Sequence, residues 1–131
     1  MSKRVYEDEY LYIDVHDSKI PWFKVFTKEP YREFSEVPFK VKLQLLAKLD
    51  ILEREMLSFF NPTKINIASF GNELPQVHFH IMARFKDDSH FPNPMWGEKL
   101  RDGCEHSSKL DEFISLVKPK LEPIELEEDD D

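Results

Sequence analysis

Apolar and polar residues alternate along several short stretches of this chain, which is the pattern of strands that bury one face. Leu11, Ile13 and Val15 fall on one side of the first stretch, for example, and polar or aromatic residues fall on the other. The stretches are residues 10–15, 21–27, 64–70 and 76–84. Because turns or short polar connections flank them, we predict that they belong to an antiparallel sheet of about five strands.

A different spacing, of three and four residues, governs residues 36–60 and predicts one long amphipathic helix. The apolar face contains Leu45, Leu46, Leu49, Leu52, Met56 and Phe60. Charged residues, Lys48 among them, are expected to cover the opposite face. Ser35 is the expected N-cap, and Asn61 followed by Pro62 is expected to end the helix.

The end of the chain adds a second, shorter helix, which we expect to be capped by Ser107 or Ser108 and ended or kinked by Pro119. Before it, residues 86–97 contain two prolines and predict an extended segment, with Trp96 as a packing anchor or a dimer contact. The fold class is therefore α+β, with an antiparallel sheet, one long helix and a C-terminal helix. Residues 1–121 are predicted to form a single domain, and residues 122–131 an acidic, disordered tail.

Composition and charge narrow the classes of function. The formal net charge of the 131 residues is −8, which argues against a general binder of DNA or RNA because phosphate backbones select basic surfaces. A single cysteine excludes an internal disulfide and favours a reducing compartment. No apolar run is long enough to span a bilayer and no signal-peptide pattern opens the chain, so we expect a cytoplasmic protein.

The stretch at residues 76–84 carries the candidate chemistry. Gln76, His78 and His80 fall on one face of the predicted strand, because side chains alternate along an extended chain. The residues between them are apolar, and a turn-like loop at 71–75 leads into the strand. Two imidazoles and a carboxamide on one face indicate a functional site rather than a packed core.

This stretch resembles the signature of the histidine triad (HIT) family, His-φ-His-φ-His-φ-φ, where φ is apolar. Gln76 stands at the first His position, His78 at the middle one and His80 at the last. The Gly-Asn-Glu-Leu-Pro-Gln sequence at 71–76 is similar to the family's approach loop. The chain looks most like a bacterial branch with Gln in place of the first His, whose Pro-rich run ending in Trp-Gly is matched at 87–97.

The resemblance implies a HIT-like fold, a homodimer and a nucleotide hydrolase or transferase that needs no cofactor and no metal. It implies that His78 attacks the α-phosphate of a nucleoside phosphoramidate or a dinucleoside polyphosphate, forming a nucleotidyl-histidine intermediate. His80 would donate to a phosphate oxygen and support the charge of the transition state. Gln76 completes the catalytic set, although a carboxamide can hydrogen-bond but cannot carry a proton.

The resemblance also implies residues that bind a nucleoside monophosphate or related nucleotide. Asn72 matches a position that contacts phosphate, and Asn66 could reach the phosphate or the ribose. His16 and Asp17 match a His-Asp pair whose carboxylate accepts both ribose hydroxyls; an Asx-type turn is the other interpretation of Asp17. The base is expected against apolar side chains near the first two strands: Ile13, Ile20 or Phe26.

Two alternatives remain open from the sequence. His78 and His80 could be ligands of a zinc or iron site completed by His90 or a carboxylate, although no third ligand stands at a recognisable spacing. The chain could also be a nucleotide-binding module with little turnover, in which Gln76 marks lost catalysis. Elemental analysis addresses the first alternative, and binding without hydrolysis across a substrate panel would support the second.

Overall fold

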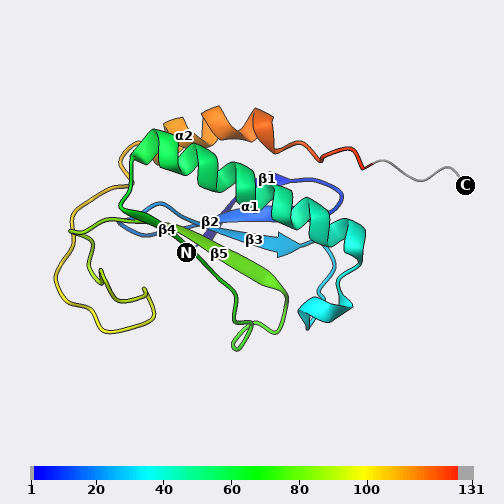
Figure 1. Cartoon of the computed structure of the whole chain (residues 1–131), viewed down its shortest axis with the longest axis horizontal. Coiled ribbons are helices and arrows are strands. Elements are labelled where there is room, and N and C mark those ends of the chain that lie inside the picture. The colour runs from blue at the N-terminus through cyan, green and yellow to red at the C-terminus, as the bar shows by residue number, and fades with distance from the viewer. Residues whose placement is uncertain (1, 127–131) are drawn as a thin grey trace, which may run out of the picture.

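A computed structural model describes residues 2–126. Five strands form one antiparallel sheet in the order β1-β2-β3-β5-β4, and two α-helices complete the fold (Figure 1). The predicted α+β class is confirmed. The strands are β1 (Ser2–Glu7), β2 (Leu11–His16), β3 (Trp22–Thr27), β4 (Lys64–Ala68) and β5 (His78–Arg84). The helices are α1 (Phe39–Phe60) and α2 (Leu110–Val117), with 3₁₀ turns η1 (Phe34–Glu36) and η2 (Lys118–Leu121).

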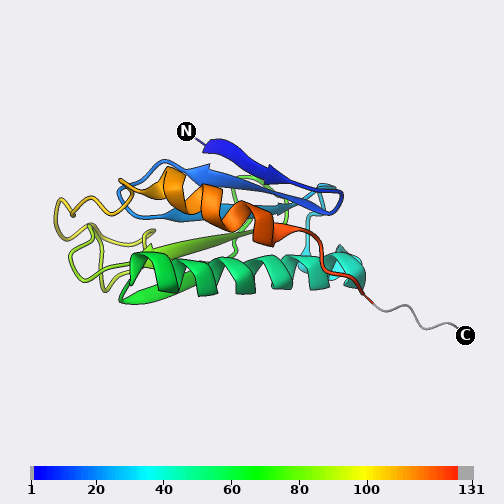
Figure 2. The same cartoon turned by 90° about the horizontal axis from the view of Figure 1, so that it is seen from above.

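Both helices cover the same face of the sheet (Figures 1 and 2). The core between them buries the apolar side of the alternating strands, as the pattern predicted: Ile13, Phe23, Val25 and Ile81 are 0–1% exposed. From α1, Leu45, Leu49, Leu52 and Met56 enter this core. Leu46, which the spacing also placed on the apolar face, is 53% exposed. The opposite face of the sheet therefore remains available for a site.

Strand β1 was not among the strands that the alternation of the sequence predicted. It is an edge strand that pairs with β2, with Tyr6 buried in the core and Val5 packed against it, while its charged residues form ion pairs. Arg4 contacts Asp14 at 3.3 Å and Glu7 at 3.0 Å. The register of the β1–β2 pairing shifts between Arg4 and Tyr6, and the adjacent residues Val5 and Tyr6 both pack on the core, so the strand shows no period-two hydrophobic signal and the sequence pattern missed it.

Helix α1 begins at Phe39, later than predicted, and Ser35 is not its N-cap. Residues 34–36 form the separate turn η1, capped by Glu33, and the Glu36 carboxylate accepts the Glu33 N–H at 2.9 Å. Val37 is extended, with φ −71° and ψ 126°. The residue before a proline avoids the helical region, so Pro38 separates the turn from the helix.

The cap predicted for the C-terminal helix is also wrong. Lys109 is the N-cap of α2 and makes no side-chain capping bond, while Ser107 contributes only its main-chain carbonyl, which accepts the Leu110 N–H at 3.1 Å. The prediction for Pro119 is confirmed, since α2 ends at Val117 and the chain continues as the 3₁₀ turn η2.

Lys48 lies inside the protein instead of on the solvent face of α1. Its side chain is 0% exposed, and its ammonium lies 3.6 Å from Oδ2 of Asp8. The Tyr6 hydroxyl donates to the same carboxylate oxygen at 2.7 Å. Burial lowers the pKa of Lys48, and the Asp8 charge opposes that shift. Helical spacing could not show this arrangement because Asp8 belongs to the turn between β1 and β2.

The C-terminal segment runs back along α1. The Gln44 side chain donates to the Ile124 carbonyl at 2.8 Å and accepts the Ile124 N–H at 3.0 Å. The disordered tail predicted for residues 122–131 therefore includes Ile124, which these hydrogen bonds hold against α1. Residues 127–131 lie outside the described residues. None of the helices within residues 2–126 is both long and apolar enough to cross a membrane.

Candidate active site

The face of the sheet that the helices leave open carries His78 and His80. Strand β5 begins at His78, two residues later than predicted, because the Val77 N–H bonds to the Tyr31 carbonyl and not to a neighbouring strand. On β3, Phe26 stands opposite His78 and Lys24 stands opposite His80. The two imidazole rings lie 5.0 Å apart between centroids, so both can reach one phosphate.

The hydrogen bonds of His78 fix its tautomer. Its Nδ1 lies 2.7 Å from the main-chain carbonyl oxygen of Gln76. A carbonyl can only accept, so Nδ1 carries the hydrogen and Nε2 keeps its lone pair. The ring is 8% exposed and stacks on Phe26 with centroids 4.7 Å apart. One ring nitrogen of His78 is thus held by the main chain, and the other is the one available as a nucleophile.

His80 has the opposite tautomer. The indole N–H of Trp22 donates to its Nδ1 at 3.0 Å, and an indole N–H can only donate, so the ring hydrogen resides on Nε2. Burial lowers the pKa of His80 to about 4, helped by the positive charges of His78, Lys24 and His16. At neutral pH His80 is therefore an uncharged donor through Nε2–H.

This environment predicts how His80 titrates. In ¹⁵N NMR, its ring should remain the neutral Nε2–H tautomer from pH 8 down to pH 5, because the folded pKa lies near 4 rather than at the usual 6.5. Between the folded pKa of about 4 and the usual pKa of 6.5, the unfolded chain binds a proton at this residue more readily than the folded chain does. This group should therefore lower the free energy of unfolding as the pH falls from about 6.5 to about 4. A His80 midpoint near 6.5 would contradict the described environment.

Gln76 reaches the site through two different groups. Its main-chain carbonyl holds His78, and its side-chain amide donates to the Thr27 carbonyl at 3.1 Å and the Tyr12 hydroxyl at 3.4 Å. The Ser69 hydroxyl bonds the His78 carbonyl at 2.7 Å and ties the approach loop to β5. Gln76 thus acts on His78 through its backbone, which a change of side chain leaves in place.

Asn66 and Asn72, both predicted to bind the nucleotide, differ in their surroundings. Asn66 lies on β4, and its Oδ1 accepts a hydrogen bond from Arg84 at 2.9 Å, so that oxygen is already engaged. Asn72 is exposed in the loop before β5 and takes no part in the hydrogen bonds that fix the two His rings.

His16 and Asp17 lie at the end of β2, on the Trp22 side of the site. The His16 ring is 4.3 Å from the Trp22 ring, which joins it to the cluster around His80. Burial lowers the pKa of His16, and Lys24 adds to that shift. Asp17 is exposed and lines a hollow of about 700 Å³ together with His16 and with residues before and at the start of α2.

None of the side chains predicted to contact the base offers a free surface. Ile13 is 0% exposed and belongs to the core under the helices, and Ile20 is 2% exposed. Phe26 is stacked on one side by Tyr12 at 4.9 Å and on the other by His78. The core position of Ile13 contradicts the prediction for that residue, because alternation gives the face of a residue but not what lies against it; contact of the base with Ile20 or Phe26 stays a prediction.

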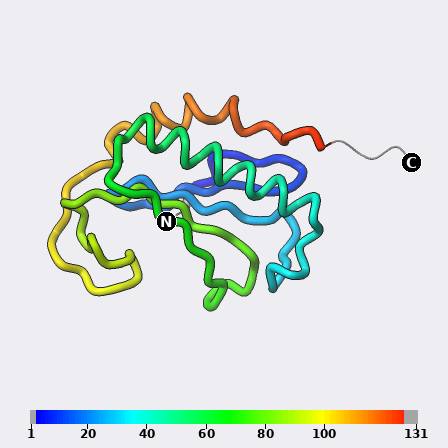
Figure 3. Tube along the Cα trace, in the orientation of Figure 1, coloured from blue at the N-terminus to red at the C-terminus, as the bar shows by residue number. Residues whose placement is uncertain are grey.

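A buried ion pair that sequence reasoning missed shapes the end of the site. Arg84 donates to both carboxylate oxygens of Asp88, at 2.8 and 3.1 Å, and both side chains are 1–2% exposed. Burial alone would raise the Asp88 pKa, but bonds from Arg84 and from three main-chain N–H groups lower it to about 2. Asp88 thereby organises the start of the long connection between β5 and α2 (Figure 3).

Two aromatic side chains of the site were also not predicted as functional: Trp22 and Trp96. Trp96 lies 4.8 Å from His80 and 5.3 Å from Trp22 between ring centroids, and is 47% exposed. The packing contacts expected of Trp96 are present. The alternation of residues 21–27 does place Trp22, Lys24 and Phe26 on one face, but it cannot show that β5 is their neighbour.

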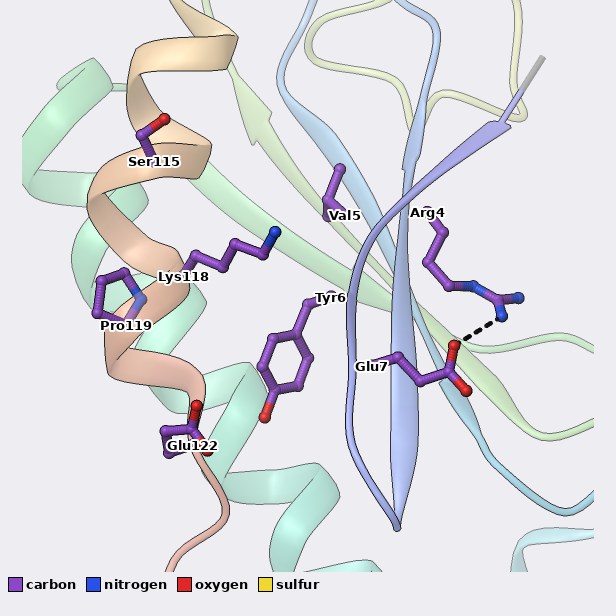
Figure 4. A pocket seen from close by; sticks show the side chains of 8 residues that line it. All are labelled: Arg4, Val5, Tyr6, Glu7, Ser115, Lys118, Pro119 and Glu122. Atoms are coloured by element: carbon purple, nitrogen blue, oxygen red, sulfur yellow. Dashed lines mark hydrogen bonds and ion pairs between the residues drawn. The ribbon is translucent and has the colours of Figure 1, made fainter.

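Other hollows lie apart from the His pair. One of about 810 Å³ lies between β1 and η2, where Lys118 extends toward β1 and Arg4 pairs with Glu7 (Figure 4). Across residues 2–126, no group of three or more His, Cys, Asp or Glu side chains is placed to hold a metal ion. The third ligand that the metal alternative requires is therefore not found in this part of the chain.

The HIT domain family model matches residues 1–87, which is more than half of the chain. The chain belongs to the HIT family. An uncharacterized HIT-like protein of Methanocaldococcus jannaschii is 26% identical over 123 residues, covering 89% of each chain. Membership of this family suggests nucleotide binding or nucleotide hydrolase or transferase activity.

Solved structures of HIT proteins share the fold. A histidine triad protein from Bradyrhizobium japonicum superposes with a TM-score of 0.76 at 25% identity, covering 92% of this chain and 90% of that one. A histidine triad protein from Marinobacter aquaeolei gives a TM-score of 0.78 at 24% identity with the same coverage. The sheet and both helices are thus those of a HIT domain.

Proposed function

We propose that this HIT protein is a nucleotide hydrolase or transferase that acts at the α-phosphate through a nucleotidyl-His78 intermediate. It would belong to the branch with Gln in place of the first His. The single observation that carries the proposal is the 2.7 Å contact between Nδ1 of His78 and the Gln76 carbonyl, which leaves the Nε2 lone pair for phosphorus.

In the first step, Nε2 of His78 attacks the α-phosphorus and a P–N bond forms. The bond from phosphorus to the leaving group breaks, and its electron pair departs with that group. Nε2–H of His80 donates to an oxygen on which negative charge develops. In the second step water attacks phosphorus, the P–N pair returns to His78, and the water proton is released to solvent or to the departed group.

The nucleoside would extend along the open face from the His pair toward His16 and Asp17. The ribose hydroxyls then lie within reach of the Asp17 carboxylate, whose two oxygens match a cis-diol. Asn66 and Asn72 would contribute amide groups near the phosphate. The HIT homodimer is part of this proposal, and light scattering at micromolar concentration should give twice 15.7 kDa.

The ribose contact predicts a non-additive pair of changes. Asp17→Asn should weaken nucleoside monophosphate binding by about 1–3 kcal/mol, because a charged hydrogen-bond partner is lost. Removing both hydroxyls from the ligand should cost the wild type a similar amount and the variant little more. Calorimetric titration of the four combinations measures the coupling, and full additivity would remove Asp17 from the ribose site.

A second candidate function, a nucleotide-binding module with little turnover, rests on the Gln76 side chain. Its amide is engaged by the Thr27 carbonyl and the Tyr12 hydroxyl, and it cannot exchange a proton. Steady-state assays across nucleoside phosphoramidates and dinucleoside polyphosphates separate the two functions. Release of nucleoside monophosphate supports the enzyme, whereas binding without release from any substrate supports the module.

A further inference from the structure

We propose that Lys24 makes this site selective for substrates whose leaving group is an anionic phosphate, as in a dinucleoside polyphosphate, over substrates whose leaving group is an amine. The inference rests on the proposed function and chooses between the two substrate classes that it leaves open. Lys24 would act by stabilising the negative charge that the leaving phosphate acquires.

The position of Lys24 places a cation beside His80. In the β3–β5 pairing Lys24 stands directly opposite His80, and such neighbours have Cβ atoms about 5 Å apart. Trp22 and Phe26 flank Lys24 on the same face of β3, and they are 8% and 5% exposed. Lys24 itself is half-buried, so its side chain is partly shielded from water, and electrostatic interactions are stronger where water is excluded.

Lys24 belongs to a row of charges that crosses the sheet. On its other side it stands opposite Asp14, and Arg4 of β1 already bonds that carboxylate at 3.3 Å. The row thus contains two cations, Arg4 and Lys24, and one carboxylate, Asp14, so its side chains carry a net positive charge, and Lys24 is the cation next to His80. The lowered pKa of His80, due first to burial and then to His78 and Lys24, reflects this field.

Proton balance at the site favours the same class of leaving group. An amine must gain a proton as its bond to phosphorus breaks, since an amide anion is far too basic to leave. Gln76 has no proton to exchange. His80 is neutral, and the Trp22 N–H donates a hydrogen bond to its Nδ1 without transferring the proton. Loss of the Nε2 proton would therefore leave an anionic ring, so His80 is a poor source of the proton that an amine needs.

A phosphate leaving group needs no such donor. When the P–O bond breaks, the electron pair stays on the phosphate oxygen, and the product is a stable anion. Nε2–H of His80 donates to that oxygen, and the Lys24 ammonium neutralises part of its charge. The residues next to the nucleophile thus match an anhydride between phosphates better than a phosphoramidate.

The test compares kcat/KM for a dinucleoside triphosphate and for a nucleoside phosphoramidate of the same base. Lys24→Met should lower kcat/KM for the triphosphate by about 10- to 100-fold, less than the loss from a fully enclosed donor, and should change the phosphoramidate rate far less. Lys24→Arg should restore most of the preference. Lys64→Met is the matched control, because Lys64 lies on the same face but beside Arg84, four residues along β5 from His80.

A second measurement reports the position of Lys24 without any turnover. In ¹⁵N NMR the pKa of His80 should rise in Lys24→Met, because a repelling charge has been removed, and should remain unchanged in Lys64→Met. If the wild type cleaves neither substrate and no His78 adduct forms, the proposed function fails. If the wild type is active but prefers the phosphoramidate, or if Lys24→Met lowers both rates equally, the inference about Lys24 is overturned.

Discussion

His78→Ala is expected to abolish turnover and to leave the binding of a nucleoside monophosphate nearly intact. The variant removes the Nε2 lone pair that is proposed to attack phosphorus, while His80 and its bond from Trp22 remain in place. The loss in kcat should exceed about a hundredfold, as removal of a covalent nucleophile normally does. Single-turnover assays and equilibrium titration measure the two effects separately.

Gln76→Ala is the informative companion to this variant. The group that holds His78 is the main-chain carbonyl of residue 76, which alanine retains. We therefore expect a much smaller loss of rate, with the His78 tautomer unchanged by NMR. His106→Ala, which removes a ring bonded to Asp87 outside the site, should leave the rate unaltered. If His78→Ala keeps more than about a hundredth of the wild-type rate, the covalent mechanism is wrong.

Arg84→Met is expected to lower the free energy of unfolding by about 3–5 kcal/mol, because it leaves the buried Asp88 carboxylate without its partner. Three other donors to Asp88 are main-chain N–H groups, which cannot neutralise its charge. Urea denaturation measures the change. The long connection after β5 should become accessible to proteases, since Arg84 also bonds the Asn93 carbonyl at 2.8 Å.

The chain provides a matched control in Arg54. It pairs with Asp50 across four residues at 2.9 Å, nearly the same spacing and distance as Arg84 and Asp88, but both side chains are exposed. Arg54→Met should cost about 0.5 kcal/mol or less, as solvent-exposed ion pairs do. Equal losses in the two variants would show that burial does not determine the strength of the Arg84 pair.

The sequence predicted those parts of the fold that depend on local periodicity. Three- and four-residue spacing gave the buried face of α1, and period-two alternation put His78 and His80 on one face of β5. It failed where a distant residue decides the outcome. Lys48 is buried beside Asp8 of the turn between β1 and β2, and β1 is held by its pairing with β2 and by Tyr6 in the core.

The same limit applies to the site. The order of residues along β5 predicts two imidazoles side by side, but their tautomers depend on Trp22 and on a main-chain carbonyl, and Lys24 becomes relevant only through the pairing of β3 with β5. Strand order is a property of the whole chain, so no local pattern contains it. On β3, polar and aromatic residues share the face that the helices leave open. Such a pattern nevertheless indicates that this face contributes side chains to a site on the neighbouring strand.

The central claim is that phosphorus becomes bonded to His78, and trapping that bond tests it most directly. Wild-type protein should be mixed with α-³²P-labelled dinucleoside triphosphate, quenched in denaturant at neutral or alkaline pH within one turnover, and digested for peptide mapping. The account predicts an acid-labile nucleotidyl group on the peptide that contains His78, and none in His78→Ala. Turnover without label on that peptide, or label on His80 instead, would contradict it.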